Sequence, residues 1–304
     1  MKRRTFLSIA LIGFLVIGIQ QIAKTSKKAS KLDFVTLEYQ GELGNKLFQT
    51  ATAIAYAKDN NLRLILPKES RSSKGLRKIL PKLDFGKAPQ NTELLEEKSS
   101  PYVYSPLPKK SNCCLKGFFI SEKYFKKYEK DIKERFAASK RLKLSLQRKH
   151  PKVFNHKCSV ALHIRTFAKD LGDLGNKLYE TYPPPDLNYI KKAISQFPDN
   201  ALFVVCSDKI SWCKKFLENI PKNFYFVEGQ KNFEDLYLMS LCDHMITSNS
   251  TFSWWAAYLN CNPNKKIIAR SPWIMRIESK ISDIIPSDWI VIEGNEDSKI
   301  PNFL

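Results

Sequence analysis

The sequence predicts an α/β protein with two halves, each built around a parallel β-sheet that helices cover. Apolar runs of strand length alternate with longer segments of helical spacing along most of the chain, which is typical of parallel sheets. With 304 residues, of which 43% are hydrophobic, the chain is long enough to bury a core in each half. A basic segment at 137–157 interrupts the alternation, so we expect an N-terminal domain at 32–150 and a C-terminal domain at 151–304.

The beginning of the chain differs from the rest, because MKRR precedes an apolar run from Phe6 to about Ile22. A run of about 17 residues, broken by little more than Ser8, Gln20 and Gln21, is at the short end for a membrane-spanning helix and is long for a signal-peptide core. No small-x-small cleavage site follows. We therefore expect residues 1–31 to form a cytoplasmic tail, an uncleaved signal anchor and the start of a solvated stem. Lysines flank both ends of the run, so the charges do not decide its orientation.

The N-terminal half opens with a βαβ unit. FVTLEY at 34–39 predicts a strand, LRLIL at 62–66 predicts the next one, and a helix ending near Asn60 lies between them. Gly41 and Gly44, in the turn before this helix, permit a positive φ or a close approach of the backbone to a ligand, although such glycine spacing is a weak signal.

The remainder of this half is less regular. Residues 67–112 contain prolines and charged runs, which predict variable loops with a short helix or two. An amphipathic, highly charged helix is expected from about Ser121 to residue 136.

The C-terminal half alternates strictly between strands and helices, which predicts a doubly wound sheet. Ligands of such sheets bind beyond the carboxyl ends of the strands. The expected strands lie at 158–165, 201–207, 223–228, 244–249 and 265–270, and the expected helices at 186–197, 210–220, 232–243 and 250–260.

The formal net charge of +20, from 50 Lys and Arg against 30 Asp and Glu, is compatible with nucleic acid, an anionic membrane surface or a phosphorylated ligand as partner. The basic residues are spread in short runs without a nucleic-acid-binding motif, so we expect a solvated, lysine-rich surface and no nucleic-acid partner. The seven cysteines lack metal-ligand spacing, and the chain has no D-x-D triplet and no glycine-rich nucleotide fingerprint. We expect no metal site.

Polar residues gather where the strand at 244–249 gives way to the next helix. Free backbone N–H groups and hydroxyls converge at such a helix N-terminus, which makes it a ready site for a phosphate. The alternative is that Ser250 or Thr251 simply caps the helix. Trp254 and Trp255 follow, and we expect both to be buried and to lock the helix against the sheet. The polar residues are Ser248, Asn249, Ser250, Thr251 and Ser253.

Further polar residues lie at strand ends of the same half. Arg165 follows the first strand, where its guanidinium can hold a diphosphate; the alternative is a surface arginine paired with Asp170 or Asp173. Asp208 closes the next strand, where a carboxylate can accept hydrogen bonds from the N1 and N2 edge of guanine or from a ribose hydroxyl, or can cap the following helix. We interpret His163, which lies within a strand, as a satisfied core histidine rather than a base.

Several segments together resemble the α-1,2-fucosyltransferases of glycosyltransferase family 11. GELGNKLFQTATAIAYA is similar to that family's opening motif, GFFISEKYF to its GYFQSEKYF segment, and HIRTFAKD to its H-x-R-R-x-D donor motif. EDLYLMSLCDHMITSNSTFSWWAAYLN resembles the family's long signature, and CSDKISWCKKFL and the closing IIPSDWIVI also fit. The likeness runs from about Phe34 to Ile292.

The resemblance implies a fold of the glycosyltransferase-B type, in which two Rossmann-like domains face a cleft. The domain at 32–150 would be the acceptor side, and the domain at 151–304 would bind GDP-fucose. It also implies inverting transfer of L-fucose from GDP-fucose to the 2-hydroxyl of a terminal galactose on a glycan, without an obligatory metal. GDP-fucose is then a donor substrate, so no cofactor is expected, and the galactose-terminated glycan is the second partner.

The resemblance further implies roles for individual residues. Arg165 would contact the β-phosphate, and His163 with Asp208 would contact the guanine edge. Ser250 and Ser253 would contact the phosphates, and Asn45 would lie near fucose and the acceptor. The full expected donor-binding set is Gly44, Asn45, His163, Arg165, Asp208, Asn249, Ser250, Thr251 and Ser253, and the catalytic set is Arg165, Asp170 and Asp173.

Three positions depart from the family pattern. Thr166 stands where the family has its second arginine, Ala168 replaces an acidic residue, and Glu42 replaces the second glycine of the opening motif. Asp170 and Asp173 can stand in for that acidic residue, and with Glu42 they are the candidates for the general base by residue type alone. Two alternatives stay open: a catalytically impaired, membrane-anchored sugar-binding homologue, and a fucosyltransferase with a different acceptor linkage.

In a eukaryotic host, a short apolar span suits the thinner early secretory membranes. We would then expect a single-pass type II Golgi membrane protein with a lumenal catalytic domain. The sequon Asn249-Ser250-Thr251 lies inside the expected donor site, and we expect it to stay unglycosylated because a glycan there would block the donor.

Overall fold

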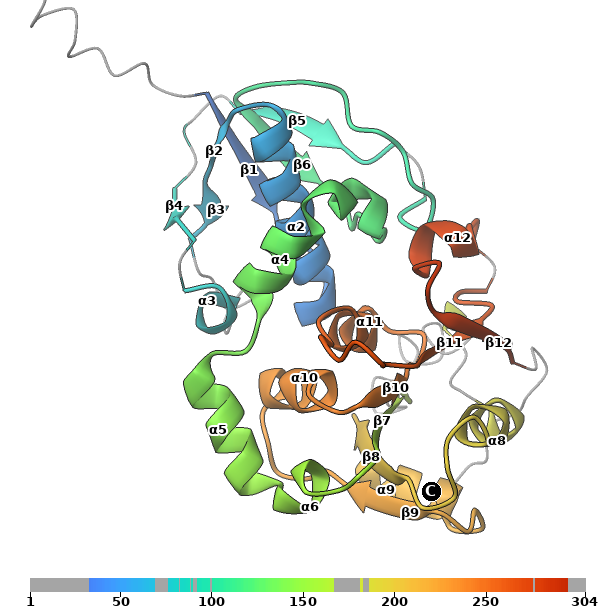
Figure 1. Cartoon of the computed structure of the whole chain (residues 1–304). Helices are drawn as coiled ribbons and strands as arrows, with labels where there is room; N and C mark the ends of the chain where they lie inside the picture. Colours follow the sequence, from blue (N-terminus) through green and yellow to red (C-terminus); the bar gives the residue numbers. More distant parts are fainter. Residues whose placement is uncertain are drawn as a thin grey trace, which may run out of the picture.

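The computed structural model describes residues 33–68, 76–81, 83–87, 89, 92–98, 100–166, 181–182, 186–275 and 277–294. Two parallel sheets follow one another along the molecule, each with helices packed beside it (Figure 1). The expectation of an α/β protein with parallel sheets is therefore confirmed. The expected anchor at 1–31 lies outside the described residues, and none of the helices that are described is long and apolar enough to cross a bilayer.

The N-terminal half holds a four-stranded sheet in the order β2-β1-β6-β5. Its strands are β1 (Phe34–Glu38), β2 (Arg63–Leu64), β5 (Glu93–Glu96) and β6 (Cys113–Lys116). A separate pair joins β3 (Leu66–Pro67) to β4 (Phe85–Gly86), and the short helix α3 (Leu76–Ile79) lies between them in the chain. The expected strand at 62–66 is thus two short strands in different sheets. β5 arises where loops were expected, and β6 follows directly after that region.

Helix α2 (Leu43–Asp59) follows β1 as the sequence predicts, and it is buried along most of its length. It is rich in alanine, the strongest helix former, whose small side chain also lets neighbouring elements lie close. The helix ends where Asn61 adopts a left-handed φ of 51°. The Leu62 N–H then donates to the Ala57 carbonyl at 2.8 Å, which satisfies one of the last helical carbonyls.

The helix expected at 121–136 is broken in the structure. It consists of two 3₁₀ turns, η2 (Glu122–Tyr124) and η3 (Lys126–Tyr128), followed by α4 (Glu129–Phe136). Phe125, between the turns, has a non-helical φ of −137°. Its buried ring stacks on Trp255 at a centroid distance of 5.5 Å. Packing of this ring therefore overrides the helical pattern of the sequence.

The C-terminal half holds a six-stranded sheet in the order β12-β11-β10-β7-β8-β9. The chain moves outward from β7 to β9, returns to place β10 beside β7, and then moves outward to β12, which is the predicted doubly wound order. The switch point of the sheet therefore lies between β7 and β10. The strands are β7 (Ser159–Ile164), β8 (Leu202–Ser207), β9 (Asn223–Phe226), β10 (His244–Ile246), β11 (Ile267–Ser271) and β12 (Ile290–Glu293). The helices are α8 (Leu187–Ile194), α9 (Ile210–Leu217), α10 (Asn232–Ser240), α11 (Thr251–Tyr258) and α12 (Ile281–Ile284).

Two helices connect the sheets where the sequence predicted only a basic boundary segment. These are α5 (Lys140–Lys149) and α6 (Pro151–Phe154), and α5 lies at the outer edge of the molecule beside α10 (Figure 1). The domain boundary at residue 150 stays a prediction.

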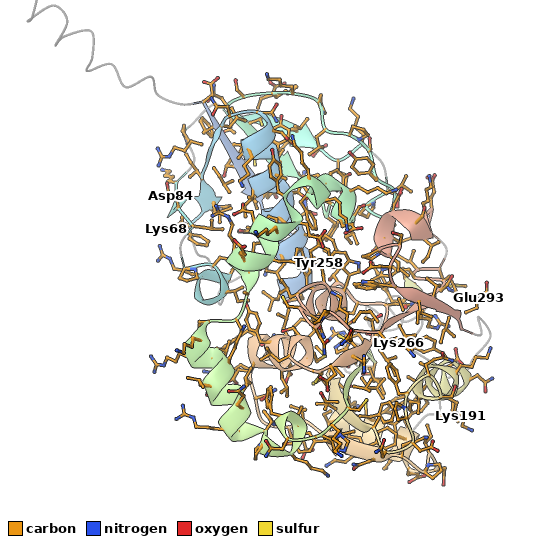
Figure 2. All side chains as sticks on the ribbon, in the orientation of Figure 1. Lys68, Asp84, Lys191, Tyr258, Lys266 and Glu293 are labelled. Carbon is orange, nitrogen blue, oxygen red and sulfur yellow. The ribbon has the colours of Figure 1, made fainter. Side chains whose placement is uncertain are left out.

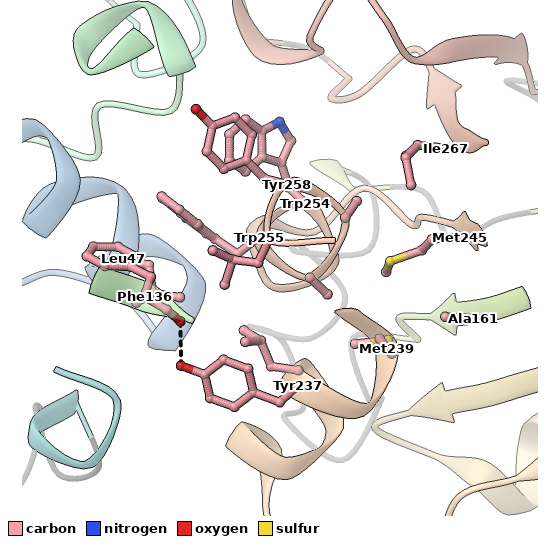
Figure 3. Packing of buried hydrophobic residues seen from close by; sticks show 14 of the residues in the cluster. Leu47, Phe136, Ala161, Tyr237, Met239, Met245, Trp254, Trp255, Tyr258 and Ile267 are labelled. Atoms are coloured by element: carbon pink, nitrogen blue, oxygen red, sulfur yellow. Dashed lines mark hydrogen bonds between the residues drawn. The ribbon is translucent and has the colours of Figure 1, made fainter. Parts of the chain in front are cut away.

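Trp254 and Trp255 are buried as expected, but they face the N-terminal half rather than their own sheet. Phe48 of α2 lies 4.4 Å from the Trp254 ring and 5.1 Å from the Trp255 ring, measured between centroids. Met245 and Ile267 of the sheet lie on the opposite side of α11 (Figure 3). Helix α11 is therefore packed on both sides and joins the two halves.

Candidate functional site

Two polar side chains hydrogen-bond to each other at the switch point of the C-terminal sheet. His163 lies near the carboxyl end of β7, Ser248 follows β10, and Nδ1 of His163 lies 2.6 Å from Oγ of Ser248. Both side chains are buried. Doubly wound sheets bind their ligands outside the strand ends at this point. We therefore take the polar residues around this pair as the candidate site.

His163 is neutral at physiological pH. Burial lowers its pKa to about 3, and the nearby negative charge of Asp208 opposes this shift only in part. Among the described residues, only Nδ1 of this imidazole has a hydrogen bond, the one to Ser248. A neutral imidazole presents one donor and one acceptor nitrogen, so Nε2 can meet one polar group of a ligand. The interpretation of His163 as a buried, non-basic side chain agrees with this geometry.

The carboxylate of Asp208 organises the segment that follows β7. Its Oδ1 accepts a hydrogen bond from the backbone N–H of Thr166 at 2.9 Å, and its Oδ2 lies 3.5 Å from Nη1 of Arg165. Arg165 is therefore paired across two strand ends. Asp208 does not cap α9, whose N-cap residue is Lys209, so the capping alternative for this carboxylate is wrong.

The hydroxyls at the start of α11 are used mainly to build the turn. Ser250 is the N-cap residue, and its Oγ accepts a hydrogen bond from the Phe252 N–H at 3.3 Å. The Oγ of Ser253 is buried and lies 3.1 Å from the carbonyl oxygens of both Ser248 and Ser250. The capping alternative thus holds for Ser250. Contacts of Ser250 and Ser253 with phosphates stay predictions.

Thr251 joins the N-terminus of α11 to the N-terminus of α2. Its Oγ1 donates to Oδ1 of Asn45 at 2.7 Å. A Cβ added to Gly44 would lie 2.5 Å from the backbone nitrogen of Phe252 and from the carbonyl carbon of Thr251. Gly41 adopts a φ of +66° one turn earlier. The glycines thus serve the left-handed turn and the close approach of two helices, one from each half of the chain.

A buried ion pair that the sequence analysis missed supports Asn249. Arg270, near the end of β11, is fully buried, and its Nη2 lies 3.5 Å from Oδ2 of Asp186. The carbonyl of Pro272 accepts from Nη1 of Arg270 at 3.4 Å and from Nδ2 of Asn249 at 3.0 Å. Oδ1 of Asn249 is buried without a hydrogen-bond partner in the described part of the chain. Arg270 closes an expected strand. The reasoning that selected Arg165, a polar residue at the carboxyl end of a strand, would therefore also have selected Arg270.

The candidates for the general base, Asp170, Asp173 and Glu42, stay predictions. Asp170 and Asp173 lie outside the described residues, and Glu42 is exposed at the start of α2. Glu97, which follows β5 and which the sequence analysis missed, accepts a hydrogen bond from the Phe118 N–H at 2.9 Å. Burial raises the pKa of Glu97. The Glu97 carboxylate therefore stabilises the segment that follows β6.

The described residues include no group of three or more His, Cys, Asp or Glu side chains arranged to hold a metal ion. Metal independence of the reaction stays a prediction.

Two relatives whose names state an activity are similar in sequence to part of this chain. An α-1,2-colitosyltransferase of Escherichia coli is 32% identical over 187 residues, which are 58% of this chain and 61% of that protein. The galactoside α-(1,2)-fucosyltransferase 2 of Oryctolagus cuniculus is 25% identical over 248 residues, which are 74% of this chain and 66% of that protein. The matched regions thus span less than two thirds of either relative.

Among solved structures, the α-1,6-fucosyltransferase NodZ of Bradyrhizobium, soaked with GDP-fucose, aligns with a TM-score of 0.48. It has 14% sequence identity over 75% of this chain and 93% of that one. The family model described as glycosyl transferase family 11 matches residues 7–293, and the chain therefore belongs to this family of glycosyltransferases.

Proposed function

We propose that the protein transfers L-fucose from GDP-fucose to the 2-hydroxyl of a terminal galactose on a glycan, with inversion at the fucose anomeric carbon. Membership of family 11 supports sugar transfer, and the name of the rabbit relative supports fucose and the α-1,2 linkage. The observation that carries the proposal is the hydrogen bond between His163 and Ser248. It brings the start of the HIRTFAKD segment, residues 163–166, together with the segment SNSTFSWW at the switch point of the sheet.

The donor would lie along the carboxyl edge of the C-terminal sheet. Its diphosphate would lie at the N-terminus of α11, where the helix dipole favours negative charge, with the guanidinium of Arg165 beside it. Guanine would lie against Nε2 of His163 and the carboxylate of Asp208. Guanine N–H groups would share this carboxylate with the Thr166 N–H, the Ser207 hydroxyl and the Arg165 guanidinium.

In this reaction the acceptor oxygen forms a bond to the anomeric carbon as the bond to the β-phosphate oxygen breaks. The proton of the hydroxyl passes to a base, and GDP leaves with additional negative charge. Arg165 and the N-terminus of α11 can stabilise that charge in the transition state. The two parallel sheets, joined through α2 and α11, support a glycosyltransferase-B arrangement with the N-terminal half on the acceptor side.

Replacement of Arg165 by Ala tests the role of the guanidinium. We expect kcat to fall by at least ~100-fold, the scale on which removal of one preorganised donor acts. Arg63→Ala is the matched control, because Arg63 is exposed and pairs with Asp84 at 2.8 Å away from the candidate site. If Arg165→Ala stays within about threefold of the control, the guanidinium does not serve the leaving phosphate.

The reaction itself is tested with the full-length protein, GDP-fucose, lactose and type 1 and type 2 galactosides, in the presence of EDTA. GDP release and the linkage of the product are the readouts. Fucose on the galactose 2-hydroxyl despite EDTA supports both the linkage and metal independence. Binding of GDP-fucose without transfer to any of these acceptors would favour the impaired sugar-binding homologue or a different acceptor linkage.

A second candidate for the donor sugar is colitose, because the relative with 32% identity is named an α-1,2-colitosyltransferase. Competition between GDP-fucose and nucleotide-activated colitose decides between the two sugars. Membrane attachment through residues 1–31 and a Golgi location in a eukaryotic host are separate predictions, which neither assay addresses.

A further inference from the structure

Helix α5 and the residues that follow it carry a dense group of cations away from the candidate site. Residues 139–157 contain seven Lys or Arg and no Asp or Glu. All seven are exposed, and in the described part of the chain only Lys149 has an ion-pair partner, Glu234 at 3.9 Å. We call this group the α5 surface, and it consists of Lys140, Arg141, Lys143, Arg148, Lys149, Lys152 and Lys157.

The outward face of α5 surrounds an exposed leucine with three of these cations. Lys140 and Arg141 precede Leu144 by four and three residues, and Arg148 follows it by four, so all four share one face of the helix. Leu144 is 48% exposed, whereas Leu146 on the inner face is buried. The helix lies at the outer edge of the molecule, with α10 on its inner side (Figure 1). The leucine is thus presented to the outside within a ring of positive charge.

We propose that the α5 surface docks on an anionic phospholipid bilayer. The bilayer supplies negative charge over an area wider than the helix, and each Lys or Arg near such a surface adds to binding. Leu144 would reach the boundary between headgroups and acyl chains, where an apolar side chain within a basic helix gains from burial. The contact would orient both halves of the molecule relative to the membrane.

The same face is poorly suited to nucleic acid. Proteins that bind single strands stack aromatic side chains on the bases, and the outward face of α5 offers an aliphatic leucine and no aromatic ring. An exposed leucine contributes nothing to binding a phosphate backbone, which depends on released counterions. Charge and the apolar residue together therefore favour a lipid surface.

The test uses the full-length protein and flotation with vesicles of phosphatidylcholine alone or with about one third phosphatidylglycerol. The readout is the ratio of the partition coefficient on anionic vesicles to that on neutral vesicles. Any contribution of the chain to binding that does not depend on lipid charge cancels in this ratio. The test variant replaces three cations of the outward face by Gln and the control replaces three exposed lysines of α8 and α9. The test substitutions are Lys140→Gln, Arg141→Gln and Arg148→Gln, and the control substitutions are Lys191→Gln, Lys192→Gln and Lys215→Gln.

Both variants lose the same net charge, so only position distinguishes them. Lys191 lies on the opposite side of the molecule from α5 (Figures 1 and 2). We expect the ratio to fall at least ~10-fold in the test variant and less than about twofold in the control. Leu144→Ser should lower binding to anionic vesicles with no loss of charge. Hydrogen exchange over residues 137–150 should slow on anionic vesicles in the wild type and in the control variant, but not in the test variant.

Equal ratios for the two triple variants would overturn the proposal, as would equal binding of the wild type to neutral and anionic vesicles. Binding to duplex RNA that exceeds binding to anionic vesicles, and that is lost in the test variant, would replace the lipid by nucleic acid. Transfer to a soluble acceptor should be the same in all these proteins, because α5 contributes nothing to the candidate site.

Discussion

Gly44 is the position where a single methyl group should separate the two halves of the candidate site. In Gly44→Ala the new Cβ would lie 2.5 Å from the backbone nitrogen of Phe252 and 2.6 Å from Oγ1 of Thr251. An ordinary contact of a Cβ begins near 3.4 Å, so the N-termini of α2 and α11 must move apart by about 0.9 Å. The hydrogen bond from Thr251 to Asn45, now 2.7 Å long, would be lost or strained.

The displacement has two measurable consequences. Misplacement of catalytic groups by about 1 Å can cost ~100-fold in rate, so we expect kcat/KM for GDP-fucose to fall between ~10-fold and ~100-fold. Overpacking of a tight contact costs about 1–3 kcal/mol, so the free energy of unfolding should fall by that amount in urea titrations. Both effects arise at one helix contact and should appear together.

Gly86→Ala is the matched control, since among the described residues its Cβ would meet Cγ2 of Ile65 alone, at an ordinary 3.5 Å. Adding Thr251→Ala to Gly44→Ala should not restore activity, because the two closest contacts are with backbone atoms. A Gly44→Ala protein as active and as stable as Gly86→Ala would show that the close approach of α2 and α11 matters to neither property. Rescue by Thr251→Ala would place the conflict in the hydroxyl instead.

Three further predictions concern buried groups. Burial lowers the pKa of His163 from 6.5 to about 3, so the unfolded chain binds the proton more tightly than the folded protein. The free energy of unfolding should therefore rise with pH between about 3 and 6.5. In His163→Gln, urea titrations should show that this part of the rise is missing. Burial raises the pKa of Asp235 from 3.8 to about 6, which has the opposite sign, so stability should fall as pH rises through this interval. Asp235→Asn should therefore be more stable than the wild type at pH 8 and should lose that advantage near pH 4. Asn249 is 3% exposed and its Nδ2 donates to the Pro272 carbonyl, so peptide mapping after expression in a glycosylating host should find it unmodified; a glycan there would contradict the burial of this amide.

β7, β8 and β11 of the C-terminal sheet were predictable because they are apolar runs buried on both faces, whereas the exposed strand β12 was missed. β7 and β8, for example, are six residues each and almost entirely buried, which is the pattern of a central parallel strand. β5 and β6 were missed because they are four residues each, with sequences ELLE and CCLK that hold no β-branched residue. β6 pairs with β1, and β5 pairs with β6, so both strands depend on their neighbours in the sheet rather than on a local signal.

The ends of the strands were predictable as positions for polar chemistry, but the pairing between them was not. The sequence offered Asp170 and Asp173 as partners of Arg165, because they are close in the chain. Within the described residues the structure pairs it with Asp208, because β7 and β8 are neighbouring strands. Asp170 and Asp173 lie outside those residues. The contact between α2 and α11 depends on how the two halves pack, and the glycine pattern alone indicates only that something comes close to Gly44.

Thr166 stands where the family has a second arginine, so this chain has one cation fewer next to Arg165. The contact that fixes the chain at this point is made by the backbone N–H of Thr166, which donates to Asp208 at 2.9 Å whatever the side chain is. Arg165 lies 3.5 Å from the other carboxylate oxygen, which is longer than a direct charge-assisted hydrogen bond. Its guanidinium has five N–H donors, so a phosphate can engage several of them while Asp208 still orients the side chain. We therefore expect Arg165, held in this way, to supply the cation at the leaving phosphate of the proposed reaction.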